Sequence, residues 1–356
     1  MNATMIGIDI AKSVFQLHGV NERREVVLQR RMSRDAALAY LAKHPRCEIG
    51  LEACGTSHHL GRILREMGHS VRLLPPDVVK AFVKARMKTD ARDARAICLA
   101  MQQPDIHVVP IKSAEQQAHR SVHRIREQLA HQHTQTANQL RSLCAEFGYL
   151  CAKGFQALHA LLDRIVAGEL AVPEIMQVEL AAQYEHLKAL QARFDAVCTR
   201  IKRLAGADAQ ARRLQAIPGV GPMIAHAMLA GVVEPERFKD GSTMAAWLGL
   251  TPGSRSSANR TRLTGITKAG DESMRSLLVC GASSLVKAAK RAPQRADPSI
   301  VALRARRPYK VVIVAIAARI ARTIWAMCRS GEDYRPRYVR PARSQATGAT
   351  PAAAAA

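Results

Sequence analysis

Alternating apolar and polar positions dominate the first part of the chain. They give the period of half-buried strands in MIGIDI (5–10), VFQLHGV (14–20), REVVLQRRM (24–32), CEIGLEA (47–53) and SVRLLP (70–75). Helical spacing appears instead in residues 33–44, with Ser33 as a candidate N-cap, and in residues 57–68, which end at Gly68. A helix with Asp90 and Asp93 follows. The order βββαβαβα predicts a mixed-sheet α/β domain over residues 1–112.

The remaining chain has a different pattern. Two long amphipathic stretches, 114–148 and 178–206, predict a helical hairpin or coiled coil over residues 113–205 and suggest a dimerisation stalk. Residues 206–335 have a mostly helical pattern around a Gly/Ser/Arg-rich loop at 249–270. The alanine-rich segment 336–356 is of low complexity, and we expect it to be disordered.

Two of the predicted strands carry acids at matched positions. On one strand Asp9 follows Gly7 on the same face, and on another Glu52 follows Gly50 in the same way. A carboxylate within an apolar strand is costly unless it has a partner. We interpret each glycine as leaving room for a ligand close to the acid.

The helical acids Asp90 and Asp93 lie three residues apart and can share one face. A solvated helix face is the simpler interpretation of such a pair. Four carboxylates on two strands and one helix could instead hold two Mg²⁺ ions, as phosphoryl-transfer enzymes do. The acids are surrounded by basic residues that we predict to contact nucleic acid, among them Arg86, Lys88 and Arg92.

Composition supports a polyanionic partner. The 356 residues include 53 Lys and Arg against 29 Asp and Glu, a formal net charge of +24, which is typical of proteins that bind phosphate backbones. None of the eight cysteines forms a C-x-x-C pair, which argues against a zinc module. The most apolar helix, near residues 310–328, is interrupted by Arg319 and Arg322. We therefore expect a cytoplasmic protein without a membrane partner.

A serine-rich stretch, TPGSRSSANRTRLTGITKAGD (251–271), combines hydroxyls with cations. An activated serine could attack a phosphodiester while arginines neutralise the developing charge. The residue types alone favour the alternative, a flexible loop that only contacts phosphate. The predicted nucleic-acid contacts in this stretch are Arg255, Arg260, Arg262 and Lys268.

A second candidate contact is the PGVG turn at residues 218–221. Gly219 and Gly221 would allow a helix-hairpin-helix turn whose backbone N–H groups contact phosphate. A plain helix–helix corner with Val220 in the core is the alternative.

The chain resembles the DEDD transposases of bacterial insertion sequences, the one-ten family and within it the eleven-eleven group. The resemblance extends nearly to Tyr334, and the stretches that carry it include IGIDIAKSVFQLHGV, GLEACGTSHHLGRIL, KTDARDARAIC, VVPIKSAEQQAHRSVHRIREQL and WLGLTPGSRSSANRTRLTGITKAGDESMRSLLVCGA. It implies an RNase-H-like (Holliday-junction-resolvase-like) N-terminal domain, a coiled-coil dimerisation segment and a mainly α C-terminal transposase domain. The four acids of the family fall on Asp9, Glu52, Asp90 and Asp93.

The resemblance also implies a mechanism. Members use a nucleophilic serine, pass through a 5′-phosphoserine and a Holliday junction, and are guided by a structured bridge RNA that pairs with donor and target DNA. Alignment from Pro252 puts the nucleophile at Ser257, with Ser256 as the alternative, although Ala258 stands where the family usually has glycine. The implied partners are double-stranded DNA, the guide RNA and further copies of the chain, as a homodimer assembling to a tetramer.

We therefore predict an RNA-guided transposase with a DEDD Mg²⁺ site and a serine nucleophile. One alternative is a metal-dependent junction nuclease in which water attacks and the serines only bind phosphate. Another is a non-catalytic nucleic-acid-binding protein derived from a transposase.

Overall fold

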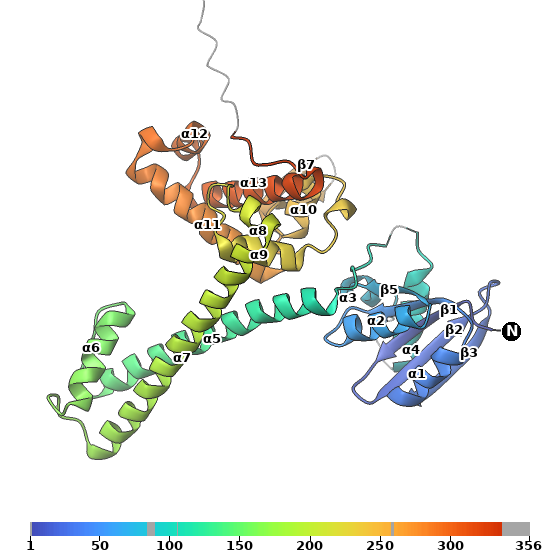
Figure 1. Ribbon diagram of the computed structural model, residues 1–356, viewed down its shortest axis with the longest axis horizontal. Coiled ribbons are helices and arrows are strands. Elements are labelled where there is room, and N and C mark those ends of the chain that lie inside the picture. Colours follow the sequence, from blue (N-terminus) through green and yellow to red (C-terminus); the bar gives the residue numbers. More distant parts are fainter. Residues whose placement is uncertain (1, 84–89, 105, 258–259, 337–356) are drawn as a thin grey trace, which may run out of the picture. The chain divides into compact units, whose positions relative to one another are not determined.

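A computed structural model describes residues 2–83, 90–104, 106–257 and 260–336, which divide into two compact units (Figure 1). Unit 1 comprises Met1–Gln191 with Ala230–Glu234, and unit 2 comprises Ala192–Leu229 with Pro235–Ala356. The predicted Arg86 and Lys88 lie outside the described residues.

Unit 1 is built on a mixed five-stranded sheet. Its strands are β1 (Met5–Ile10), β2 (Val14–Val20), β3 (Val26–Ser33), β4 (Glu48–Glu52) and β5 (Ser70–Leu74). Their order is β3-β2-β1-β4-β5, with β2 antiparallel to both neighbours and β1, β4 and β5 parallel. The prediction of a mixed α/β domain is confirmed, and this strand order is that of an RNase-H-type sheet.

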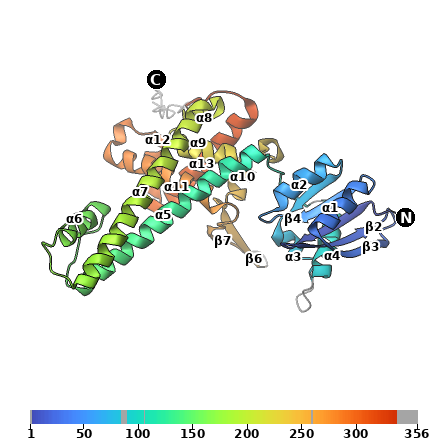
Figure 2. The same ribbon diagram turned by 60° about the horizontal axis from the view of Figure 1, so that its bottom comes forward.

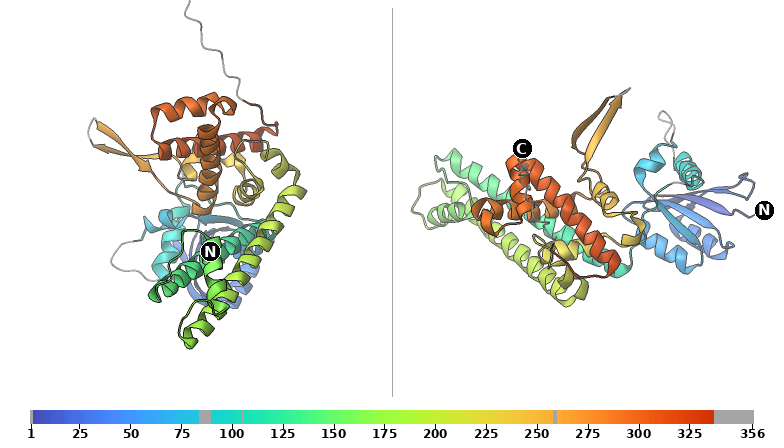
Figure 3. Two further views of the ribbon diagram at one scale, coloured as in Figure 1. Left: turned by 90° about the vertical axis from the view of Figure 1, so that its left-hand side faces the viewer. Right: turned by 90° about the horizontal axis from the view of Figure 1, so that it is seen from above.

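Helices cover both faces of this sheet. One face packs on α1 (Arg34–Lys43) and α2 (Ser57–Glu66), the other on α4 (Asp90–Met101), and a short helix, α3 (Pro76–Lys80), follows β5 (Figure 3, right). The side chain of Ser33 caps α1 by accepting a hydrogen bond from the Ala36 N–H at 3.3 Å, as predicted. The core under α1 and α2 takes the apolar positions of the alternating pattern, including Ile6, Ile8, Phe15, Ile49 and Leu51.

The opposite face meets α4 at unusually short range because two of its residues are glycines. A Cβ built on Gly7 would lie 2.6 Å from the backbone nitrogen of Cys98 and would overlap the Ala94 carbonyl. A Cβ on Gly50 would lie 2.7 Å from Cγ of Met101. The interpretation of these glycines as room for a ligand is therefore wrong, because a helix fills the space.

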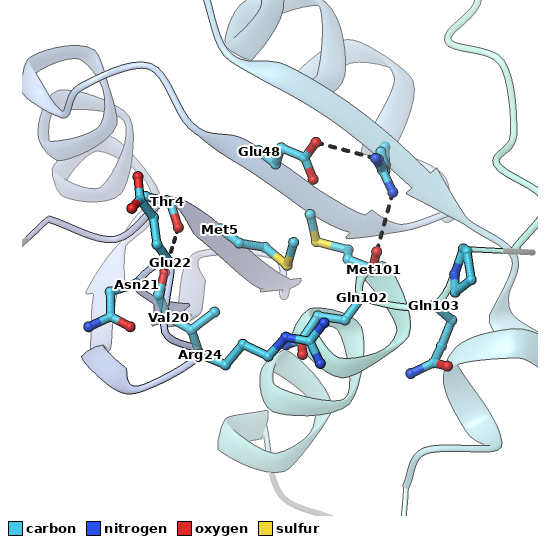
Figure 4. Close-up of a pocket in the computed structure, with 12 residues that line it drawn as sticks. Thr4, Met5, Val20, Asn21, Glu22, Arg24, Glu48, Met101, Gln102 and Gln103 are labelled. Carbon is cyan, nitrogen blue, oxygen red and sulfur yellow. Dashed lines mark hydrogen bonds and ion pairs between the residues drawn. The ribbon is translucent and has the colours of Figure 1, made fainter.

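The C-terminal end of α4 is held by a strand residue. Arg72 on β5 donates from one guanidinium nitrogen to the Met101 carbonyl at 3.2 Å and from the other to Glu48 Oε1, also at 3.2 Å. Figure 4 shows both contacts beside a cavity of about 330 Å³ that is lined by Met5, Glu48 and Met101 among others. Helix α4 is thus fixed along its length by packing and at its end by hydrogen bonding.

Beyond the sheet, unit 1 continues into long helices. The polar patterns predicted α5 (Ala114–Glu146) and α7 (Glu174–Ala207), and the part of α7 after Gln191 belongs to unit 2. Helix α6 (Phe155–Val166) lies where the pattern was ambiguous. A capping box between Ser113 and Gln116 starts α5. Helix α6 packs on α5 and the first half of α7 through a shared apolar core (Figure 2). The dimerisation role of this segment stays a prediction.

Unit 2 is mainly helical, as predicted. Its helices are α8 (Ala209–Leu214), α9 (Pro222–Gly231), α10 (Gly241–Trp247), α11 (Glu272–Arg291), α12 (Pro298–Arg306) and α13 (Tyr309–Ser330), with short 3-10 turns at Pro235–Arg237 and Pro293–Arg295. Among the described residues, only α13 is long and apolar enough to span a membrane; half of that window is buried, and the helix packs against α10, α11 and α12, as a core helix does.

The loop expected at 249–270 is instead a two-stranded antiparallel ribbon. Its strands are β6 (Pro252–Ser257) and β7 (Arg260–Ile266), and it extends away from the helices of unit 2 (Figure 3). The prediction of a loop failed because a ribbon stabilised by backbone pairing needs no run of apolar residues.

The close packing of α4 predicts a stability effect. Gly7→Ala should lower the free energy of unfolding by about 1–3 kcal/mol, because the added methyl group overlaps the backbone of α4. Gly55→Ala is the matched control, since a Cβ there meets nothing within 4 Å. Denaturant unfolding of the two variants measures the difference, and equal stability would contradict the packing argument.

Candidate acidic site

The two strand acids end side by side at the carboxyl edge of the sheet. Strands β1 and β4 are parallel neighbours in which Gly7 pairs with Gly50 and Ile8 pairs with Leu51. The next residue on each strand is an acid, Asp9 on β1 and Glu52 on β4. Both carboxylates follow their glycine on the face that α4 covers.

Helix α4 brings the other two acids to this edge. Its buried residues Ala94, Ile97 and Met101 face the sheet at helical spacing. Asp90 and Asp93 continue that stripe toward the helix N-terminus, so the residues that pack on the glycines also fix the acids. Asp90 is exposed and Asp93 is half-buried, and Asp93 Oδ1 is buried without a hydrogen-bond partner.

The pKa of Asp9 responds to the other three carboxylates. Burial, followed by the charges of Asp93, Asp90 and Glu52, raises the pKa of Asp9 from 3.8 to about 6. A carboxylate with three acidic neighbours and partial burial is destabilised in its charged form. The sequence prediction that these acids come together is therefore supported by their placement.

The acids fit a hard divalent cation. Within the described residues no three ligating side chains already form a closed metal cluster. The donors are nonetheless all carboxylate oxygens, which Mg²⁺ prefers, and the unpartnered Asp93 Oδ1 is an acceptor that a cation would satisfy. A cation would also relieve the repulsion that raises the pKa of Asp9.

The serine stretch lies on the ribbon of unit 2. In its register Arg255 pairs with Arg262, Ser256 with Thr261, and Ser257 with Arg260. Directly paired positions of an antiparallel ladder share one face, and successive positions alternate. Position 257 therefore shares a face with positions 255, 260 and 262, whereas position 256 falls on the other face.

The base of the ribbon is held by a buried arginine that the sequence reasoning missed. Arg275 on α11 is 8% exposed. It donates to the carbonyls of Leu248 and Ala269, at 3.2 and 2.8 Å, which flank the two strands. The exposed Lys268 at the same base has a left-handed backbone with φ of 55°. No periodicity in the sequence marks a side chain that acts on two distant carbonyls.

Of the remaining predicted nucleic-acid contacts, some are packed inside the protein and others face open space. Gly219 has φ of +82°, and a Cβ there would lie 2.9 Å from Leu285 on α11, so this turn packs into unit 2. Val220 is buried, as the helix–helix corner requires. Gly221 has open space around its Cα, and Arg92 is exposed on α4 beside the acids. Phosphate contact by these residues stays a prediction.

Comparison with known proteins identifies the family of the chain. Residues 6–147 match a DEDD-type transposase model of the IS110 family, and residues 211–297 match the model described as Transposase IS116/IS110/IS902 family. The chain belongs to the IS110 family of transposases. Membership makes it a DNA phosphoryl-transfer enzyme and implies DNA binding and a metal ion.

Several bacterial proteins are similar to this transposase over nearly its whole length. The Sinorhizobium fredii protein y4pF/y4sB is 42% identical over 331 residues, covering 93% of this chain and 85% of its own. The "Probable family 20 transposase" of Pseudomonas aeruginosa is 40% identical, covering 94% and 100%. The transposase for insertion sequence element IS1111A of Coxiella burnetii is 33% identical, covering 93% and 91%.

The acidic site predicts a pH-dependent stability of the metal-free transposase. Because the folded protein raises the pKa of Asp9 from 3.8 to about 6, it holds this proton more tightly than the unfolded chain. The free energy of unfolding should therefore fall as pH rises through that interval and then level off. At pH near 7.5, Asp9→Asn should be more stable than wild type by on the order of 1 kcal/mol, after discounting for solvent screening.

The matched control is Glu66→Gln, an exposed acid at the end of α2. It should leave the pH dependence unchanged. Thermal unfolding at several pH values in EDTA, and again with Mg²⁺, measures both variants. Mg²⁺ should stabilise wild type and Glu66→Gln but not Asp9→Asn; equal stabilisation of all three would contradict a site at Asp9.

Proposed function

We propose that this transposase cleaves and rejoins DNA with two Mg²⁺ ions and a serine nucleophile, guided by a structured RNA encoded by its element. The single observation that supports it best is the effect of three acids on a fourth at one sheet edge: the charges of Asp93, Asp90 and Glu52 all raise the pKa of Asp9. A carboxylate whose charged form is destabilised by neighbouring acids favours a role in binding cations over a role in stability.

The four acids would hold the Mg²⁺ ions. When bound, the ions supply positive charge that stabilises the oxygens of a phosphodiester during displacement. Asp93 is the acid most clearly available to a cation, because its buried Oδ1 has no hydrogen-bond partner. Strand pairing of Asp9 with Gln16 and of Glu52 with Leu74 fixes the backbone from which both carboxylates extend.

Ser257 is the nucleophile that the ribbon register favours. It shares a ladder face with the positions of Arg255, Arg260 and Arg262, whereas Ser256 does not. Arginines on that face can neutralise the charge of the phosphate under attack. In the proposed step a bond forms between Ser257 Oγ and phosphorus while the bond from phosphorus to the 3′ oxygen breaks. The serine proton is lost to solvent and the departing 3′ oxygen gains one, leaving a 5′-phosphoserine and a free 3′-OH.

The proposal of a guide RNA and of an oligomeric assembly is based on charge and on the family resemblance. The formal net charge of +24 suits polyanionic partners, and both DNA and RNA are such partners. Donor and target DNA, the bridge RNA and a dimer assembling to a tetramer complete the proposal, and bacterial DNA places the reaction in the cytoplasm. Sequencing the RNA that co-purifies with the transposase tests the guide: its loops should match the element ends and the insertion site.

The second candidate function is a metal-dependent junction nuclease. The same acids would serve it, with water as nucleophile and the ribbon serines only contacting phosphate. A decayed, non-catalytic transposase is the third. Loss of Mg²⁺-dependent strand exchange in Asp9→Asn would exclude the third, and the serine variants separate the first two.

Substitution of the serine gives the sharpest prediction. Ser257→Ala should abolish the covalent protein–DNA adduct and lower strand exchange by at least about 10³-fold, because the nucleophile is lost. Ser256→Ala is the matched control on the opposite ladder face and should retain the adduct. Denaturing gel electrophoresis with labelled DNA detects the adduct. Its persistence in both variants would contradict a ribbon nucleophile, whereas Mg²⁺-dependent cleavage by wild type without any adduct would favour the nuclease.

A further inference from the structure

A cationic cluster joins α2 to the start of α5 within unit 1. We define it as His58 and Arg62 on α2, Lys112 before α5, and Arg124 on α5. His58 follows the loop that leaves β4 after Glu52, so the cluster begins at the same carboxyl edge of the sheet as the acids. None of these residues has a role in the acidic site or the serine ribbon.

Two hydrogen-bond donors converge at the centre of the cluster. The backbone N–H of Lys112 donates to Nδ1 of His58 at 3.3 Å. Nδ1 is thus the acceptor of the neutral ring, and the ring hydrogen lies on Nε2. Nε2 in turn lies 3.3 Å from Nζ of Lys112, which also donates when charged. Two facing donors are satisfied together by an oxygen that accepts from both.

The position of Lys112 is fixed by Arg62. One guanidinium nitrogen of Arg62 donates to the Lys112 carbonyl at 2.8 Å and to Gln117 Oε1 at 3.0 Å. These bonds hold the backbone of Lys112 between α2 and α5. The converging donors therefore belong to a preformed arrangement rather than to two freely rotating surface side chains.

The electrostatics of the cluster are those of cations without a compensating acid. Burial, followed by the charges of Lys112, Arg62 and Arg124, lowers the pKa of His58 to about 4. Burial also lowers the pKa of Lys112, followed by the charges of Arg120 and Arg124. Every charged group that perturbs these two residues is positive, and a partly buried group of cations is stabilised by a bound anion.

We propose that His58 Nε2, Lys112 Nζ and Arg124 bind one phosphodiester group of a nucleic-acid strand. Phosphate oxygens only accept hydrogen bonds and carry the negative charge that the cluster lacks. The choice of a nucleic acid over a free anion rests on the proposed function, because the cluster begins at the sheet edge that carries the acids. DNA and RNA share this chemistry, and the experiment separates them.

Salt-dependent binding tests the proposal. The full-length transposase is titrated, by fluorescence anisotropy in Mg²⁺-free buffer at several KCl concentrations, into a mixed-sequence DNA duplex and into a structured RNA. Lys112→Gln and Arg124→Gln should each lower the slope of log K against log[KCl] by about 1. Each should weaken binding roughly 3- to 10-fold at physiological salt.

The matched control is Lys43→Gln, which removes an exposed charge from the last turn of α1. It should leave the slope and affinity unchanged. Circular dichroism confirms folding, and Arg124, which is exposed, provides the test if Lys112→Gln does not fold.

If affinity and slope fall only with the RNA probe, the guide RNA is the ligand. If they fall only with the duplex, DNA is the ligand. Either result supports the site. Wild-type slopes with both probes for a folded variant would overturn it. Failure of the proposed function has a different signature: the covalent adduct would persist in Ser257→Ala while these binding differences remain.

Discussion

The close approach of α4 to the sheet is the constraint on which the candidate site depends. Gly7 and Gly50 pair across β1 and β4 and offer no side chain to the helix that crosses them. The helix can therefore sit low on the sheet, where its N-terminal turn carries Asp90 and Asp93 to Asp9 and Glu52. Since one helical stripe provides both the packing residues and the acids, displacement of the helix would also displace the carboxylates.

The acidic site lowers the stability of the metal-free protein and provides carboxylates that can bind cations. Partial burial and three acidic neighbours raise the pKa of Asp9 to about 6, which means that its charged form is disfavoured in the metal-free protein. The large apolar core beneath α1 and α2 and the anchoring of α4 by Arg72 offset that cost. Such local destabilisation within an otherwise well-packed domain is typical of a functional site.

Much of the N-terminal fold could be predicted from sequence, because strand alternation and the Ser33 cap are local signals. The four acids were found in the same way, from their strand faces and their helical spacing. The role of Gly7 and Gly50 could not be predicted, since only the tertiary structure shows which element approaches a glycine. The ribbon at 252–266 was missed because backbone pairing stabilises it without apolar periodicity. The contact of Lys112 with His58, 54 residues away, has no sequence signal at all.

The most direct test is a crystal structure of the transposase with Mn²⁺, which takes the same oxygen ligands as Mg²⁺ and is located by anomalous scattering. The account predicts anomalous peaks at the carboxyl edge of β1 and β4, ligated by Asp9, Glu52 and Asp93, with Asp90 completing the site. Absence of a peak there at millimolar Mn²⁺, or Mn²⁺ bound by other residues only, would contradict it.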